Sequence, residues 1–325
     1  MANTKKMKLL FFGAGVLGSL YAARLHEAGH DVTLLARGSR YQNLKKHGVV
    51  LEAFDTGAIT QTFVRVVDTM PTDEPFDACI ILVRGNQLEE ALNVLKQNPH
   101  IDYYVSMVNA VTGTSSLVQA LGRDRVILGH ANAGGERDGH RIRYMISQEI
   151  TLGELDGERT ERLETLAGAF RSANLPVVFS QDMDAWKRYH VALAVPFANA
   201  LYMSGGCNYR LSRNREALRL CINGIREGFH TLRTLDFPVE PPKLRWILAL
   251  PNAILIPLFA RILRLKVADI GMARHARNAR DEMAALAAEF DALIATADVK
   301  TPALDALRPY ADPALPLDFE EEVAS

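Results

Sequence analysis

The sequence has little of several features that mark specialised classes of protein. Its 325 residues include only three cysteines, Cys79, Cys207 and Cys221, whose spacing fits neither a disulfide framework nor a zinc site. The formal net charge is −1, so the chain lacks the positive field that recruits nucleic acid. We therefore expect a reduced, cytoplasmic protein with no nucleic-acid partner.

Long hydrophobic runs are also missing. The most apolar window, residues 247–260, is too short to span a bilayer, and Pro251 and Pro257 interrupt it. We expect it to form a buried helical segment or a subunit contact in a homodimer; contact with a membrane surface is the alternative. The apolar run after the N-terminal lysines is too short for a signal sequence and fits a first strand.

The remaining composition is that of an ordinary globular protein, with 48% hydrophobic and 23% charged residues, and the length suffices for two domains. Strand and helix patterns alternate up to about Ser180, and only helical periods follow. We therefore predict a doubly wound, Rossmann-type α/β domain in residues 1–180. An all-helical domain for substrate binding or dimerisation is predicted in residues 181–325.

The hydrophobic pattern also predicts the individual elements. Continuous apolar runs such as 76–83 are typical of buried parallel strands. Segments 49–53 and 60–66 flank Asp55-Thr56-Gly57, which predicts a hairpin, and segments 141–146 and 149–153 are expected to pair and close the sheet. The other predicted strands are 8–12, 31–36, 103–108, 126–130 and 175–179; the main predicted helices are 41–48, 158–173, 182–203, 213–235 and 272–297, and residues 313–325 are expected to form a disordered acidic tail.

The first predicted strand runs directly into the motif Gly13-Ala14-Gly15-Val16-Leu17-Gly18, which a helical pattern follows. In G-x-G-x-x-G, the first glycine allows a tight turn, the second leaves room for a pyrophosphate, and the third lets the helix pack closely. The helix N-terminus offers N–H groups and a positive dipole end to the phosphates. The motif predicts a dinucleotide site; a glycine-rich turn without a ligand is the alternative.

The end of the second predicted strand indicates which dinucleotide binds. A carboxylate there would accept the 2′-hydroxyl of NAD, but the chain reads Ala36-Arg37-Gly38-Ser39-Arg40. Arg37 can pair with a 2′-phosphate, Ser39 and Arg40 can add contacts, and no carboxylate at this strand end repels the phosphate. We therefore predict NADP as the cofactor, unless the arginines are only solvated loop charges.

Three further polar side chains follow the carboxyl ends of predicted strands, where ligands of open parallel sheets lie. Arg84 and Gln87 follow the strand at 76–83, and Asn109 follows the strand at 103–108. We expect all three near the glycine turn, in contact with the cofactor.

A second signature, Trp186-Lys187, opens the helical part and completes a resemblance to the ketopantoate reductase (2-dehydropantoate 2-reductase) family. The resemblance extends over most of the chain and includes the glycine motif, Arg37-Gly38, Gln87, Asn109 and residues 152–157. It implies an active site between the two domains, with Lys187 as the catalytic acid. A lysine ammonium can stabilise and protonate the alkoxide that forms when a ketone is reduced. Without the resemblance, Lys187 would be taken as a solvated helix lysine.

The chain departs from the family on the substrate side. The family places asparagines four and eight residues after the lysine, where this chain has Val191 and Val195. The hydroxyls of ketopantoate would lose water there without replacement, at about 1–3 kcal/mol each, which favours a more apolar ketone or aldehyde. The candidate substrate-binding residues are Asp269, aligned with a glutamate of the family, and His190 and Asn199 as replacements.

Together these features predict an NADPH-dependent oxidoreductase that reduces a 2-keto acid or related small carbonyl compound, with Lys187 as general acid. A dehydrogenase acting oxidatively on a hydroxy or amino acid derivative is one alternative, and a catalytically silent NADPH-binding sensor or scaffold is another. Two arginine clusters, Arg210/Arg213/Arg215/Arg219 and Arg274/Arg277/Arg280, are expected to be solvated faces, with an anion clamp as the alternative.

Overall fold

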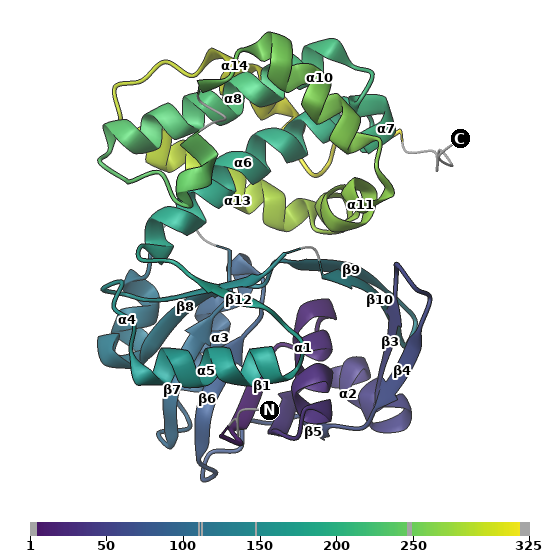
Figure 1. The fold of residues 1–325 in the computed structure, drawn as a ribbon, viewed down its shortest axis with the longest axis vertical. Helices are drawn as coiled ribbons and strands as arrows, with labels where there is room; N and C mark the ends of the chain where they lie inside the picture. Colours follow the sequence, from purple (N-terminus) through teal and green to yellow (C-terminus); the bar gives the residue numbers. More distant parts are fainter. Residues whose placement is uncertain (1–4, 110, 112, 147, 246–248, 319–325) are drawn as a thin grey trace. The chain divides into compact units, whose positions relative to one another are not determined.

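The computed structural model of the chain describes residues 5–109, 111, 113–146, 148–245 and 249–318. The chain divides into two compact units, one of Met1–Val108 with Gly113–Asp184 and one of Asn109–Thr112 with Ala185–Ser325 (Figure 1). The first unit is a Rossmann-type α/β structure and the second is helical, so the predicted fold class is confirmed.

A mostly parallel sheet forms the centre of the first unit. Among the described residues it has eight strands, in the order β12-β11-β8-β7-β6-β1-β2-β5. The six strands from β5 to β8 run parallel, whereas β11 is antiparallel to β8. Its strands are β1 (Lys8–Phe12), β2 (Asp31–Leu35), β5 (Arg65–Val67), β6 (Phe76–Ile81), β7 (Ile101–Ser106), β8 (Val126–His130), β11 (Ile150–Glu154) and β12 (Val177–Phe179).

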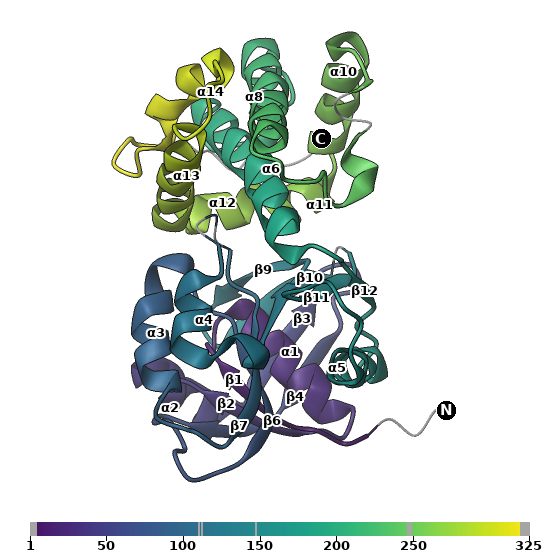
Figure 2. The ribbon, with the colours of Figure 1, turned by 90° about the vertical axis from the view of Figure 1, so that its left-hand side faces the viewer.

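Helices lie on both faces of this sheet (Figure 2). Helices α1 (Val16–Glu27) and α5 (Glu161–Ser172) cover one face, and α3 (Leu88–Leu95) and α4 (Ser115–Leu121) cover the other. The apolar face predicted for the helix at 158–173 is buried in α5, where the hydroxyl of Thr160 caps the N-terminus by accepting from the N–H of Leu163. Helix α2 (Gly38–His47) begins earlier than the predicted 41–48 and ends before Gly48, whose φ is +64°.

A second, smaller sheet in the order β4-β3-β10-β9 corrects part of the strand prediction. The hairpin of β3 (Val49–Ala53) with β4 (Ile59–Thr62) is confirmed, but the predicted segment 60–66 splits, because β5 leaves to pair with β2. The predicted pairing of 141–146 with 149–153 is wrong. Strand β10 (Arg141–Ile146) pairs with β9 (Ala133–Asp138) across the turn at Gly139, whereas the buried run of β11 pairs with β8.

The small sheet is tied to helix α1. The hydroxyl of Tyr21 donates to the carbonyl of Ala131 at 2.6 Å, and the guanidinium of Arg24 donates to the hydroxyl of Tyr144 at 2.7 Å. An added Cβ on Gly135 would lie 3.0 Å from the side chain of Val16. Strand β9 therefore packs beside the first turn of α1, next to the glycine motif.

The second unit is built around the long helix α6, which contains Pro196 in its interior. The predicted helix at 272–297 is interrupted, because Ala279 takes a non-helical φ of −128° between α12 and α13. The α-helices that the structure describes in this unit are α6 (Met183–Met203), α7 (Asn208–Leu211), α8 (Arg215–Thr234), α10 (Asn252–Leu263), α11 (Lys266–Ala268), α12 (Arg274–Asn278), α13 (Arg280–Ile294) and α14 (Pro302–Leu307).

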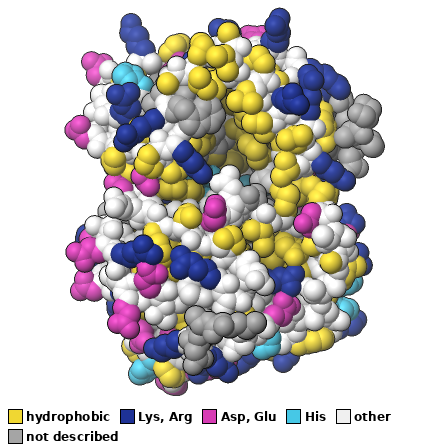
Figure 3. Space-filling model, viewed as in Figure 1, with side chains coloured by type: hydrophobic (Ala, Val, Ile, Leu, Met, Phe, Trp, Pro, Cys, Tyr) yellow, Lys and Arg dark blue, Asp and Glu magenta, His cyan; other side chains and the backbone are white. Residues whose placement is uncertain are grey.

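Of the two expectations for the apolar window 247–260, burial is wrong for one side of helix α10, and a subunit contact stays a prediction. Ile254 is 51% exposed and Leu258 is 41% exposed, and hydrophobic side chains are visible at the surface of this unit in Figure 3. Part of the window, residues 247 and 248, lies outside the described residues. Among the helices that the structure describes, none has the length and apolarity needed to cross a membrane. The homodimer and the cytoplasmic location stay predictions.

Candidate functional site

The three glycines of the motif occupy three different steric environments. Gly13 has a φ of +117°, and an added Cβ would lie 2.3 Å from the carbonyl oxygen of Leu82. A Cβ on Gly18 would lie 1.8 Å from the carbonyl oxygen of Gly13. At Gly15, which precedes the first residue of α1, a Cβ would meet nothing within 4 Å. Gly13 and Gly18 are therefore needed to close the turn, whereas Gly15 leaves space open at a helix N-terminus.

Open space at this position suits the pyrophosphate of a dinucleotide. The turn lies at the carboxyl end of β1, which is flanked by β2 and β6 in the sheet. In parallel sheets, ligands bind outside the carboxyl ends of the strands, where the N–H groups of the following helix are available. Ala14, Val16 and Leu17 supply the backbone of the turn and of the first helical residues. Their contact with a cofactor is a prediction that this geometry supports.

Arg40 holds helix α2 against the glycine turn. Its Nε donates to the carbonyl of Ala14 at 3.0 Å, and one terminal nitrogen donates to the hydroxyl of Ser19 at 2.9 Å. Burial, with a smaller effect from the positive charge of Arg137, lowers the pKa of Arg40 to about 10. The charge of Arg137 thus acts on Arg40, and Arg137 was not recognised from the sequence because it comes from β9 of the small sheet.

Arg37 lies at the carboxyl end of β2, where its terminal nitrogen pairs with Oε1 of Glu90 at 2.7 Å. Both side chains are exposed, so the pair is weak and exchangeable. No carboxylate stands in residues 36–40, as the sequence shows, but α3 supplies one to Arg37 from a distant segment. Glu90 was missed because it is far from Arg37 in the sequence; its position in the first turn of α3 is typical of a helix-stabilising carboxylate.

The segment after β6 is also brought to the turn. The N–H of Leu82 donates to the carbonyl of Phe12 at 2.9 Å, immediately before Gly13. Beyond it, Arg84 and Gln87 are exposed, and the backbone N–H of Arg84 donates to Oε1 of Gln87 at 3.4 Å. Asn109 follows β7 but groups with the second unit. The cofactor contacts predicted for these three residues stay predictions.

Lys187 lies in the first half of α6 and is buried, with 7% of its surface exposed. One turn further on, the ring of His190 stacks on that of Trp186, with centroids 5.4 Å apart and an interplanar angle of 11°. Burial, together with the charges of His275 and Lys187, lowers the pKa of His190 to about 4. His190 is therefore neutral at pH 7. His275, from α12, is a member of this cluster that no local sequence signal indicated.

The loop that follows β7 is anchored to the same helix. The guanidinium of Arg188 donates to the carbonyl of Val111, and the N–H of Val111 donates to Oε2 of Glu289 at 3.0 Å. Arg188 also lies over the ring of Phe237, 4.5 Å from its centroid. Val111, two residues after Asn109, is thus held by α6 and α13.

The other predicted substrate residues have mixed surroundings. Val191 and Val195 pack in the apolar core of the second unit, and Asn199 is buried one turn beyond Val195. Asp269 is buried at the start of a π-helical turn, Asp269–Ala273. Its two carboxylate oxygens pair with Arg274 at 2.8 Å and Arg277 at 2.9 Å. These two arginines are mostly buried, so the expectation of a solvated arginine face is wrong for them.

The described part of the C-terminal tail is also held by arginines, contrary to the expected disorder. Arg280 donates to the carbonyls of Leu315 and Asp312, at 2.5 and 2.6 Å. Arg210 pairs with Asp318. Residues 319–325 lie outside the described residues.

Comparison with known proteins agrees with the motifs. Residues 9–157 match the family model described as "Ketopantoate reductase PanE/ApbA". The chain is 31% identical over 182 residues to a 2-dehydropantoate 2-reductase of Aquifex aeolicus, covering 54% of this chain and 56% of that protein. The chain spans less than two thirds of the length of the curated relatives that it matches first.

Solved structures share the fold over nearly the whole chain. A 2-dehydropantoate 2-reductase of Geobacter metallireducens superposes with a TM-score of 0.78 at 17% identity, covering 95% of this chain and 100% of that one. A D-mandelate dehydrogenase solved with NADH and anilino(oxo)acetate superposes with a TM-score of 0.72 at 14% identity, covering 94% and 97%. The family model and the curated relative confirm the resemblance to the ketopantoate reductase family, and the solved structures show that the fold is shared.

Proposed function

We propose that this ketopantoate reductase-like oxidoreductase uses NADPH to reduce a 2-keto acid, or a related carbonyl compound with an apolar side chain, to the alcohol. The observation that carries the proposal is the glycine turn. Gly13 and Gly18 close the turn, because neither position has room for a side chain, and Gly15 leaves open space at the N-terminus of α1. A pyrophosphate can occupy this space and accept hydrogen bonds from the N–H groups of the helix.

The choice of NADPH rests on Arg37 and Arg40. Bound NADPH would supply the hydride, and its 2′-phosphate would compete with Glu90 for the guanidinium of Arg37. Because the Arg37–Glu90 pair is exposed, a dianionic phosphate can replace the carboxylate at little cost. Arg40 would keep the turn in place through Ala14 and Ser19 and add positive charge beside it.

Lys187 would act as the proton donor. As hydride reaches the carbonyl carbon, the ammonium Nζ would protonate the carbonyl oxygen and become a neutral amine, so the products are the alcohol and the oxidised dinucleotide. Its burial lets the ammonium act with little competition from water. The neutral ring of His190 adds no second positive charge beside the ammonium at pH 7.

The side chains at the positions of the family's substrate residues favour an apolar substrate. The positions one and two turns along α6 from the lysine are Val191 and Val195, which offer no hydrogen bonds, and the carboxylate of Asp269 is already paired with two arginines. The fold is shared with a D-mandelate dehydrogenase whose bound anilino(oxo)acetate is a 2-oxo acid with an aromatic group. A 2-oxo acid with an apolar side chain needs fewer hydrogen-bond partners than a dihydroxylated keto acid, so it loses less where this chain lacks the two asparagines of the family.

The test measures NADPH oxidation against a panel of 2-keto acids, ketones and aldehydes that includes ketopantoate. Lys187→Ala should lower the turnover of the preferred compound by about 10²–10⁴, with NADPH affinity nearly unchanged. Lys243→Ala removes an exposed lysine of the same unit and serves as the matched control. Full turnover by Lys187→Ala would refute the acid assignment, and NADPH binding without turnover of any panel member would favour the silent sensor.

A further inference from the structure

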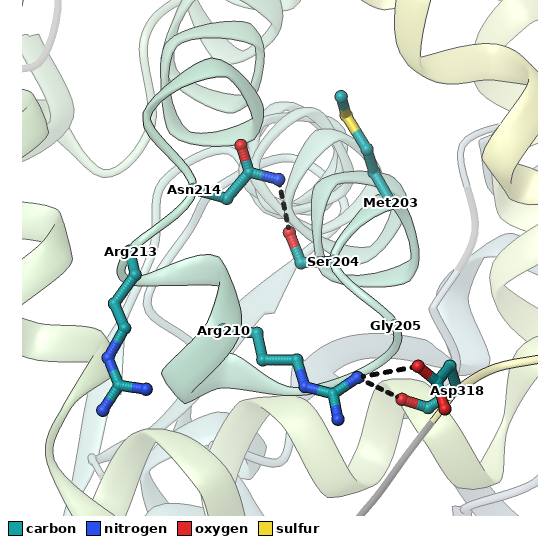
Figure 4. Close-up of a pocket in the computed structure, with 7 residues that line it drawn as sticks. All are labelled: Met203, Ser204, Gly205, Arg210, Arg213, Asn214 and Asp318. Atoms are coloured by element: carbon teal, nitrogen blue, oxygen red, sulfur yellow. Dashed lines mark hydrogen bonds and ion pairs between the residues drawn. The ribbon is translucent and has the colours of Figure 1, made fainter.

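A shallow cavity of about 550 Å³, largely open to solvent, lies in the second unit, where α6 ends and α8 begins (Figure 4). It lies apart from Lys187, because Lys187 and Met203 occupy distant positions of α6 whose Cα atoms are roughly 24 Å apart at about 1.5 Å per residue. Its lining residues are Met203, Ser204, Gly205, Arg210, Arg213, Asn214 and Asp318.

At the wall of this cavity, Gly205 allows the guanidinium of Arg210 to lie close to the backbone. Gly205 has a φ of +72°, and an added Cβ would lie 2.9 Å from the carbonyl oxygen of Asp318 and 3.1 Å from a terminal nitrogen of Arg210. A side chain at this position would therefore push both groups away. Asn214 fixes the opposite side, since its amide donates to the hydroxyl of Ser204 at 3.3 Å and its oxygen accepts from the N–H of Ala217 at 3.1 Å.

The chain already places a carboxylate at this guanidinium. One terminal nitrogen of Arg210 donates to the carbonyl of Asp318 at 2.5 Å and lies 3.3 Å from Oδ2 of the same residue. The two side chains differ in exposure, at 27% for Arg210 and 90% for Asp318. A carboxylate so open to solvent contributes little binding free energy, so another anion can displace it.

We propose that this cavity is a binding site for an oxyanion-bearing small molecule, with Asp318 as its intramolecular competitor. A guanidinium can donate to two oxygens of a carboxylate or a phosphate at once, and Arg213 adds a second positive charge at the rim. The N-terminus of the 20-residue helix α8 directs its positive dipole end to the same place. The site is independent of the proposed reductase function.

The experiment titrates the full-length chain by calorimetry with inorganic phosphate and, separately, with succinate. Asp318→Asn removes the competing charge and should tighten binding by about 2–5-fold, which matches the value of an exposed ion pair. Arg210→Gln should weaken it by at least about tenfold, the loss expected for a charge-assisted hydrogen bond. Arg219→Gln removes an exposed charge of α8 outside the lining and should leave the affinity unchanged.

The two probes separate the chemical classes. Binding of phosphate alone would assign a phosphorylated ligand, and binding of succinate would extend the site to carboxylates. Gly205→Ala provides a second variant that keeps every charge but displaces the guanidinium, and it should weaken binding as Arg210→Gln does. The proposal is overturned if neither anion binds to the unmodified chain or to Asp318→Asn, or if Arg219→Gln loses as much affinity as Arg210→Gln.

Discussion

The glycine turn allows a prediction that separates folding from cofactor binding within one motif. Gly15→Val should fold and lose NADPH, whereas Gly18→Ala should lose stability first. Gly15 has φ −71° and ψ −162°, an extended conformation that valine adopts readily, and its Cβ would meet no atom within 4 Å. The side chain would instead occupy the space assigned to the pyrophosphate.

The magnitude at Gly18 follows from the same geometry. Its added Cβ would start 1.8 Å from the carbonyl oxygen of Gly13, far inside the 3.4 Å at which ordinary contact begins. Overpacking of this kind costs about 1–3 kcal/mol or more, and the better helix propensity of alanine returns at most about 1 kcal/mol. Because the clash is with the backbone, we expect the upper end of this cost, a net loss of about 2 kcal/mol, and the melting temperature should therefore fall by roughly 4–8 °C.

The assay pairs thermal unfolding with a fluorescence titration of NADPH on both variants. Gly15→Val should melt within a few degrees of the unmodified chain, because replacing glycine at an N-cap costs less than about 1 kcal/mol. Its NADPH affinity should fall at least about a hundredfold, or about 2.7 kcal/mol. Normal NADPH binding by Gly15→Val would show that the turn is not the cofactor site, and an unchanged melting temperature for Gly18→Ala would refute the steric reasoning.

Three further predictions rest on single side chains. Arg37→Ala should narrow the preference for NADPH over NADH by about 1–3 kcal/mol and Glu90→Gln should widen it, as measured by titration calorimetry; equal affinities of the unmodified chain for both cofactors would contradict this. Hydrogen bonding from Arg65 lowers the pKa of Glu74 from 4.5 to about 2. The ionised Glu74 therefore stabilises the folded chain by on the order of 1–2 kcal/mol after screening above pH 4.5, and this contribution is lost as the pH falls towards 2. Glu74→Gln should therefore differ from the unmodified chain in urea unfolding at pH 7 but not near pH 2, and a constant difference would refute it. Val191→Asn places an amide in the apolar core and should lower the free energy of unfolding by about 1–3 kcal/mol in the same assay; an unchanged value would show that the amide finds a polar partner.

Much of the fold follows from patterns that are local in the sequence. The buried runs of β1, β6 and β8, and the amphipathic face of α5, were predictable because strand and helix periods act over a few residues. The pairing of β10 was not, because segments 141–146 and 149–153 are adjacent in the chain but join different sheets. Which sheet an apolar strand joins depends on the strands that other parts of the chain supply.

The sequence by itself determined the glycine motif, because its spacing lies within six residues, and the position of Lys187 on α6, because a helical period extends over it. The carbonyl of Leu82, which excludes a side chain at Gly13, comes from a distant segment. Only the tertiary structure decided what the charged side chains meet. It brought Glu90 into an ion pair with Arg37 and Asp318 into one with Arg210. It also paired Asp269 with Arg274 and Arg277. Ion pairs between distant segments leave no periodic trace in the sequence, because they form only after packing has brought the backbones together.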